Sequence, residues 1–142
     1  MNFELVTLDG VKYQGETYSV ILPTAAGQIT VLPGHEAMLS QLVPGIITVR
    51  RAKGDSDAKL EHYATYGGVV EISTKGVRVL VDEATHGDEI NVAEAQKAHD
   101  AATRLRTEAK DKVELDRAQA LVERHGVRLQ VAELRRRHNH KG

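Results

Sequence analysis

The chain has 142 residues, no Cys, no Trp and one Phe, which excludes disulfides and thiol chemistry and leaves Val, Ile, Leu and Ala to build any core. Its net charge of −1 is unevenly distributed: seven Lys or Arg face eleven Asp or Glu in residues 1–88, whereas the part from Arg124 onward carries six basic residues and one acidic, which favours an acidic partner. No apolar run is long enough to span a bilayer and the first residues lack a signal-peptide pattern, so we expect a soluble chain that stays where it is made.

Short strands are predicted in the first part of the chain from alternating or β-branched residues. The expected strands cover residues 3–8, 16–22, 28–32, 46–49, 60–66, 69–73 and 77–81. Turn residues separate them, and residues 50–59 have the polar composition of a hairpin loop. Short strands at nearly regular spacing are typical of two packed antiparallel sheets, so we predict an antiparallel β-sandwich over residues 1–87.

Residues 22–49 contain all three prolines of the chain and organise this domain. Proline cannot donate a backbone hydrogen bond, and glycine alone takes positive φ freely. The pairs Pro33-Gly34 and Pro44-Gly45 are therefore predicted to be rigid corners between strands. Gly67-Gly68 is expected to separate two further strands.

After Asp88 the hydrophobic period changes to three and four residues, which predicts helices. Asn91 with Glu94, and Asp111 with Glu114, have the pattern of helix-starting capping boxes. The apolar stripes are Val92, Ala95, Ala98, Ala102, Leu105 and Ala109, then Leu115, Ala118, Val122, His125, Leu129 and Ala132. We predict an antiparallel helical hairpin over residues 88–142, with one long helix as the alternative, and an α+β fold class overall.

The hairpin is expected to be weakly held. Its first stripe is mostly alanine, which buries little area at about 0.8 kcal/mol per methylene-sized group. Gly126 weakens the second helix by roughly 1 kcal/mol relative to Ala. An appendage of this kind can detach and re-dock.

No catalytic constellation occurs in the sequence. It has no phosphate-binding loop, no nucleophile elbow and no His-Glu-x-x-His pair, so we expect no catalytic residue. His138 and His140 could hold a metal ion only weakly, because ligands need fixed geometry, and no metal site is expected.

One set of residues resembles the signature of the epsilon subunit of F-type ATP synthases: Pro23-Thr24, Gly27, Ile29, Val31-Leu32-Pro33, His35, Leu39, Leu42 and Pro44-Gly45. Gly67-Gly68 before Val70-Glu71, residues 77–84 and Glu89-Ile90 match in the same order, so the resemblance extends over most of the chain. It implies a non-catalytic rotor subunit of the central stalk, which couples proton-driven rotation of the c-ring to ATP synthesis. It also implies inhibition of ATP hydrolysis by the C-terminal helices, and a peripheral location at the cytoplasmic face of the bacterial plasma membrane through the complex alone, with a plastid thylakoid as the alternative.

The resemblance further implies the partners and their contact residues. Met38 and Leu42 would face the gamma subunit, unless they are buried in the sandwich. The loop 25–30, with Gln28 at its most polar point, would meet the c-ring, unless it is a plain hairpin tip. His35 matches a histidine of the signature, either at a subunit interface or as a turn residue bonded to nearby backbone.

A basic stripe follows the second helix, at Arg117, Arg124, Arg128 and Arg135. With Arg136 and Arg137 it resembles the inhibitory arm of the family, which approaches an acidic segment of the beta subunit. The alternative is a solubilising helix face. A nucleic-acid-binding role is disfavoured, because the β-domain is acidic and lacks interleaved aromatic residues.

Some bacterial relatives bind ATP with a motif that begins Ile-Asp-x-x-Arg-Ala. Here Ile90 is followed by Asn91, and Glu94 precedes Ala95, so the acid is an amide and the arginine is a glutamate that would repel phosphate. Only Arg124 and Arg128 remain from that constellation. We expect no cofactor and weak or no ATP binding, which leaves a nucleotide-sensing module as the rival function.

Overall fold

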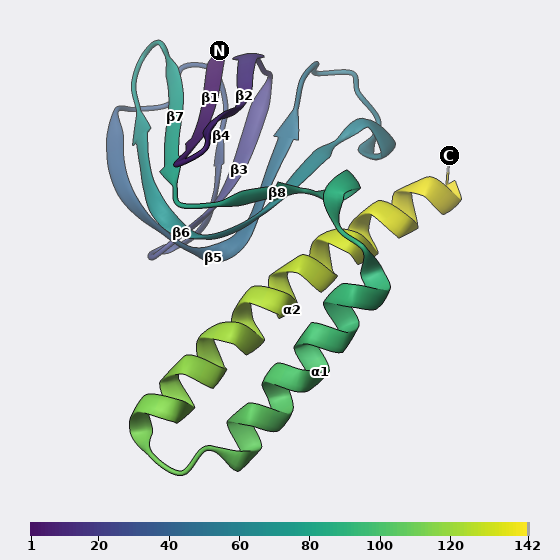
Figure 1. Ribbon diagram of the computed structural model, residues 1–142. Helices are drawn as coiled ribbons and strands as arrows, with labels where there is room; N and C mark the ends of the chain where they lie inside the picture. The colour runs from purple at the N-terminus through teal and green to yellow at the C-terminus, as the bar shows by residue number, and fades with distance from the viewer. Residues whose placement is uncertain (142) are drawn as a thin grey trace.

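The computed structural model describes the backbone of residues 1–141 and the side chains of residues 1–137. A strand-built part is followed by two long helices that run beneath it (Figure 1). The strands are β1 Asn2–Thr7, β2 Gly10–Glu16, β3 Ser19–Thr24, β4 Gly27–Val31, β5 Met38–Arg50, β6 Glu61–Ile72, β7 Gly76–Val81 and β8 Ala84–His86. The helices are α1 Val92–Glu108 and α2 Lys112–Lys141, with short 3-10 helices η1 Asp57–Lys59 and η2 Gly87–Glu89.

The strands form one hydrogen-bonded sheet in the order β2-β1-β7-β6-β5-β3-β4, with β8 paired to β6. It folds into two layers because β5 and β6 are long enough to take part in both. Residues 38–42 and 68–72 of these strands belong to the layer of β7, β1 and β2, and their other halves pair with β3 and β8. The predicted sandwich is confirmed, although β1 and β7 run parallel.

Two predicted strand breaks are wrong. Pro44 and Gly45 pair with Tyr66 and Thr65 inside the β5–β6 ladder, and β6 continues through Gly67-Gly68. Gly67 has a φ of 114°, and a Cβ on Gly68 would lie 2.3 Å from the carbonyl oxygen of Leu80. The glycines therefore let two paired strands bend and approach β7 without separating. Only Pro33-Gly34 is a true corner, where the His35 N–H donates to the Leu32 carbonyl oxygen at 3.1 Å.

The edge strands were the hardest to predict. β2 was missed, because only Tyr13 of its seven residues is buried and no clear alternation marks it. β4 begins at Gly27, so the predicted loop 25–30 is reduced to a tip at Ala25-Ala26. An edge strand has one hydrogen-bonded neighbour, and its residues are correspondingly polar and exposed.

The sandwich core takes side chains from both layers. Its largest fully buried members are Phe3, Leu5, Leu22, Leu42, Ile47 and Ile72. Each such side chain contributes about 1.5–3 kcal/mol when removed from water. This core, rather than the alanine-rich helices, carries most of the stability of the fold.

The predicted helical hairpin is confirmed, and its caps lie where the sequence indicates. The Asn91 side chain accepts a hydrogen bond from the Glu94 N–H at 3.1 Å. Asp111 accepts one from the Glu114 N–H at 2.8 Å, while the Glu114 carboxylate accepts from the Lys110 N–H at 3.0 Å. These polar caps stop one helix and start the next without glycine or proline.

The predicted apolar stripes are only partly correct. Ala95, Ala102, Ala118 and Ala132 are buried, whereas Val92, Leu105 and Leu115 are exposed. Val127 and Val131 lie outside the predicted stripe and are buried in a second cluster with Ala64 and Ile90. They were missed because α2 has two contact faces, one toward α1 and one toward the sandwich (Figure 1).

Candidate interaction surfaces

Arg124 fastens the middle of α2 to the sandwich. Its guanidinium donates to the carboxylate of Glu83, between β7 and β8. The same group lies 4.3 Å from the centroid of the Tyr66 ring, a cation–π distance. One cation thus joins a carboxylate and an aromatic face of the sandwich, and neither contact was predicted from the sequence.

Arg135 makes a second attachment three helical turns further on. Its Nε atom lies 2.9 Å from Oδ1 of Asp88, and its Nη1 donates to the Gly87 carbonyl oxygen at 3.3 Å. Asp88 itself is fixed in η2, where its N–H donates to His86 Nδ1 at 3.0 Å. Between the two arginines, Val127 and Val131 form the apolar part of this docking interface.

The predicted basic stripe is therefore divided. Arg124 and Arg135 face the sandwich, while Arg128 is half-buried and Arg136 is exposed. Arg117 is exposed and lines a groove of about 500 Å³ between α2 and the strand bend, together with Pro44 and Tyr66. Arg137 is exposed as well, and the side chains of His138 and His140 lie outside the described residues.

The residues at the degenerate ATP motif have structural roles in this conformation. Ile90 and Ala95 are buried between the helices and the sandwich, and Asn91 caps α1. Glu94 is exposed beside that cap. Arg124 is neutralised by Glu83, which leaves Arg128 as the other basic residue of the proposed constellation.

The two residues predicted to face gamma differ in exposure. Met38 is half-buried and packs against the core, but Leu42 is 2% exposed. The prediction of Leu42 as an exposed contact is wrong, because residues 38, 40 and 42 alternate with their outward-facing neighbours. Leu39 is the exposed leucine of this segment, at 77%.

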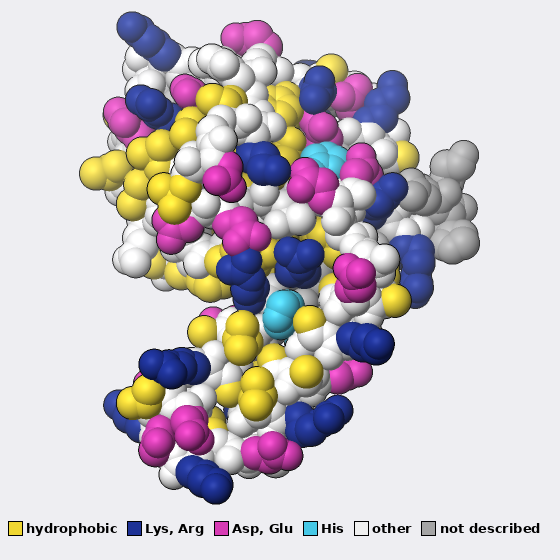
Figure 2. Space-filling view, in the orientation of Figure 1, with side chains coloured by type: hydrophobic (Ala, Val, Ile, Leu, Met, Phe, Trp, Pro, Cys, Tyr) yellow, Lys and Arg dark blue, Asp and Glu magenta, His cyan; other side chains and the backbone are white. Residues whose placement is uncertain are grey.

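An apolar row crosses the outer face of the β2-β1-β7-β6 layer. Val6 pairs with Val11 on one side and with Leu80 on the other, and Leu80 pairs with Val69. Figure 2 shows hydrophobic side chains gathered on the left flank of the sandwich. The sequence signal was available: in β7 the alternate residues Val77, Val79 and Val81 already fill the core, so Leu80 places an apolar side chain outward.

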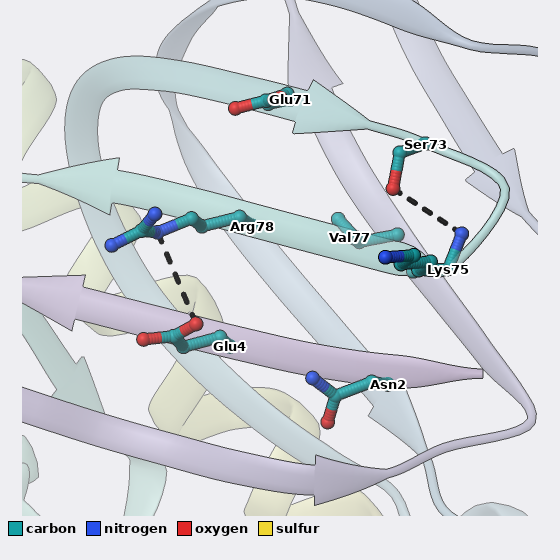
Figure 3. A pocket seen from close by; sticks show the side chains of 8 residues that line it. Asn2, Glu4, Glu71, Ser73, Lys75, Val77 and Arg78 are labelled. Carbon is teal, nitrogen blue, oxygen red and sulfur yellow. Dashed lines mark hydrogen bonds and ion pairs between the residues drawn. The ribbon is translucent and has the colours of Figure 1, made fainter.

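A charged row lies two residues along the same strands and lines a shallow hollow (Figure 3). Arg78 Nε lies 3.9 Å from Oε2 of Glu4, and Arg78 pairs across the ladder with Glu71. The Lys75 N–H donates to Ser73 Oγ at 3.3 Å in the adjoining turn. The side chains that line the hollow carry charges of alternating sign across neighbouring strands and border the apolar row.

The other two predicted contact residues, Gln28 and His35, belong to neither row. Gln28 is exposed on β4, paired with Pro23 next to the tip of the β3–β4 hairpin. His35 follows the Pro33-Gly34 turn, and its Nδ1 donates to the Glu36 carbonyl oxygen at 2.9 Å. That hydrogen bond is the one expected of a turn residue. The role of His35 at a subunit interface stays a prediction.

The perturbed tyrosines belong to the packing of the sandwich. Burial raises the pKa of Tyr63 and, to a smaller extent, of Tyr13, so both hydroxyls stay neutral. The hydrogen bonds that Arg51 donates to the Glu61 carboxylate raise the pKa of Arg51, whose guanidinium lies 5.1 Å from the Tyr13 ring centroid. Among the described residues no group of three or more His, Asp or Glu side chains could hold a metal ion. In the described part of the chain, no helix is long and apolar enough to cross a bilayer.

The comparisons with known proteins agree with this architecture. Residues 1–87 match the family described as ATP synthase, Delta/Epsilon chain, beta-sandwich domain. The chain belongs to the ATP synthase epsilon-chain family. An epsilon chain of Brucella anthropi is 34% identical over 95 residues, which cover 67% of each chain. An epsilon chain of Brucella canis is 32% identical over 107 residues, or 75% of this chain and 76% of the relative.

Solved ATP synthases contain the same fold as this epsilon-family chain. One chain in the OSCP/F1/c-ring structure of the Euglena gracilis mitochondrial ATP synthase matches with a TM-score of 0.78 and 26% identity, covering 92% of this chain and 79% of that one. A chain of the Tetrahymena thermophila central stalk and c-ring matches with a TM-score of 0.58 and 14% identity, which supports the fold alone, over 93% and 96% of the two chains. Membership of the family makes this chain a non-catalytic subunit of the enzyme complex.

Proposed function

We propose that this chain is a rotor subunit in the central stalk of a proton-driven F-type ATP synthase. It connects the c-ring, through gamma, to the catalytic head, and performs no chemistry itself. The observation that carries this proposal is the family match over residues 1–87, supported by the likeness to a chain of the Euglena OSCP/F1/c-ring structure. The chain acts at the cytoplasmic face of the bacterial plasma membrane as a peripheral part of that complex.

The gamma subunit covers the apolar row of Val6, Leu80 and Val69. Leu80 is 44% exposed and Val69 is 45% exposed, in the middle of a sheet layer rather than at a loop tip. Contiguous apolar side chains on a sheet face are typical of a protein interface, and the charged row at Glu4 and Arg78 supplies the polar rim. Leu39 extends the surface at the start of β5.

The c-ring meets the tip of the β3–β4 hairpin. Ala25 and Ala26 form the turn, and Gln28 is exposed beside it. Small residues allow close backbone approach, and an exposed amide can both donate to and accept from polar loops. The tip is also rigid, because Thr24 Oγ1 donates to the Gly27 carbonyl oxygen across the turn.

The helical hairpin regulates the reverse reaction. When α2 leaves the sandwich, Arg124 and Arg135 lose Glu83 and Asp88 and become free to meet an acidic segment of the beta subunit. The docked hairpin and the inhibitory contact thus compete for the same two cations. This competition explains why a basic stripe useful for inhibition is partly turned inward here.

The docked state is weak enough for such competition. Half-exposed ion pairs contribute about 0.2–1 kcal/mol each, and a cation–π contact about 0.5–1 kcal/mol. The Tyr66 hydroxyl is buried with no hydrogen-bond partner in the part of the chain described, which costs docking energy. A partner that replaces these polar contacts and covers Val127 and Val131 again, at about 1.5–3 kcal/mol for each buried side chain, can therefore release the arm.

An engineered disulfide between α2 and the sandwich, which can be formed by oxidation and broken by reduction, tests this regulation. A Cβ at position 87 would lie 3.2 Å from Cγ1 of Val131, within the range that a disulfide bridges, and the chain has no cysteine of its own. In the assembled complex, oxidised Gly87→Cys/Val131→Cys should hydrolyse ATP faster than the same complex after reduction. Deleting residues 111–142 should raise the rate as well. Equal rates in all of these forms would exclude inhibition by the hairpin.

Assembly is tested separately from regulation. Co-expressed with gamma, the chain should purify as a stoichiometric pair, and Leu80→Asp should abolish the pair while leaving the sandwich folded. Arg78→Ala, in the charged row beside it, is the matched control and should weaken binding little. Failure of the unmodified chain to bind gamma would overturn the rotor assignment.

A further inference from the structure

Two histidines lie between the two helices, near the middle of the hairpin. A Cβ placed on Gly126 would lie 4.0 Å from Cδ2 and Nε2 of His99, so the His99 ring of α1 rests against the α2 backbone at this glycine. His125 is the preceding residue of α2 and was predicted on the stripe that faces α1. Both rings are only partly exposed, and the Nδ1 atom of His125 is buried with no hydrogen-bond partner among residues 1–137.

The charges that act on His125 all have the same sign. Burial, and then the cations of Arg128 and Arg124, lower the pKa of His125 below its usual 6.5, and His99 acts in the same direction. Arg128 and Arg124 belong to α2 itself, and His99 belongs to α1. Glu83, on the sandwich side, is committed to Arg124. A proton on His125 would therefore be placed among cations, in a site where its Nδ1–H has nothing to donate to.

We propose that His125, beside His99, is an acid-sensitive point of the hairpin, which holds α1 and α2 together while the His125 ring is neutral and lets the hairpin open when that ring is protonated. The inference concerns the isolated chain and does not depend on the rotor assignment. The small area buried by the alanine-lined helix pair makes the contact effective, because little apolar packing opposes the repulsion.

The direction of the pH dependence follows from proton linkage. The pKa of His125 is lower in the closed hairpin than in the open one, so the open form binds protons more tightly. The closed form is fully favoured above the ordinary histidine value of about 6.5, and this advantage is lost as the pH falls through the lowered value. Acidification shifts the population toward the open hairpin.

The experiment measures the separation of the helices in the full chain. Spin labels on Lys97→Cys and Gln130→Cys, one exposed position on each helix, label only these sites because the chain has no cysteine. Distance distributions are recorded between about pH 8 and about pH 5.5, which brackets the titration of histidine. The short-distance population should fall on acidification, and circular dichroism should show that the strands persist.

Two substitutions separate this contact from general acid effects. His125→Gln should flatten the pH response, whereas His35→Gln, in the sandwich, should leave it as in the unmodified chain. An unmodified chain whose distances do not change with pH, or a His125→Gln chain that responds equally, would overturn the proposal. If His125→Gln is open at every pH, the NMR titration of the unmodified chain decides: a His125 midpoint below 6.5 supports the proposal, and one at or above 6.5 overturns it.

Discussion

The Nε atom of Arg135 lies 2.9 Å from Oδ1 of Asp88, in the short 3-10 helix that joins the sandwich to the hairpin. The far end of α2 is thus tied to the hinge from which the hairpin starts. Arg124 repeats the arrangement at Glu83, just before β8. The segment 83–88 therefore carries both acidic anchors of α2, so a movement of the hairpin must break both of them.

Removing the Arg124 anchor should weaken docking without unfolding the sandwich. Arg124→Ala loses a half-exposed ion pair and a cation–π contact, which together amount to about 1 kcal/mol. Hydrogen exchange of the α2 amides should accelerate about fivefold, while that of β1 and β7 stays constant. Arg104→Ala, an exposed arginine of α1, is the control; equal acceleration in both variants would mean that the Glu83 pair contributes nothing specific.

Alanine substitutions at two glycines should change the stability of the chain in opposite directions. A Cβ on Gly126 meets only the His99 ring at 4.0 Å, so Gly126→Ala should stabilise α2 by up to about 1 kcal/mol. A Cβ on Gly68 would lie 2.3 Å from a backbone oxygen, so Gly68→Ala should destabilise the sandwich. Urea denaturation checks both, and a loss of stability in Gly126→Ala would show that the helices pack more tightly there than these distances indicate.

Leu42 and Leu39 lie on the same strand, but substituting Leu42 should lower the stability of the fold, whereas substituting Leu39 should weaken the binding of gamma. Leu42 is 2% exposed, so Leu42→Ala should lower the free energy of unfolding by about 2–5 kcal/mol. Leu39 is 77% exposed, so Leu39→Ala should change stability by less than about 0.5 kcal/mol and weaken the pairing with gamma instead. Unfolding curves and co-purification measure the two effects, and a reversed pattern would contradict the assignment of the two faces of β5.

ATP should bind weakly or not at all. Glu94 stands where nucleotide-binding relatives carry arginine, and Arg124 is already paired with Glu83. Calorimetric titration with ATP in the millimolar range should give no saturable heat. The variant Asn91→Asp/Glu94→Arg restores the motif and is the positive control; saturable heat in the unmodified chain would support the nucleotide-sensing alternative.

The helical part shows which structural features local sequence patterns can predict. Asn91 and Asp111 cap their helices as expected, because capping depends on residues three positions apart. Val127 and Val131 were missed because their burial depends on the sandwich, which the periodicity of α2 does not report. The same limit applies to Arg124 and Arg135, whose acidic partners lie more than forty residues away in the sequence.

The strand 38–43 shows the corresponding limit in the sheet. Its alternation puts Met38 and Leu42 on one face and Leu39 and Val43 on the other, and both faces are apolar. The pattern determines which residues share a face, but the packing of the second layer determines which face is buried. The sequence therefore left Leu42 open between a contact with gamma and burial in the sandwich, and the fold places it in the core.

The sequence by itself determined that a strand-built part precedes a helical hairpin, where the helices are capped, and the resemblance to the epsilon family, since each depends on residue types at short or fixed spacing. The tertiary structure decided where β5 and β6 bend, which apolar face stays exposed, and which arginines turn inward. Those features arise from contacts between segments far apart in the chain, where the energy of pairing and burial outweighs local preference. Pro44-Gly45, a corner by composition and a paired bend in the molecule, is the clearest case.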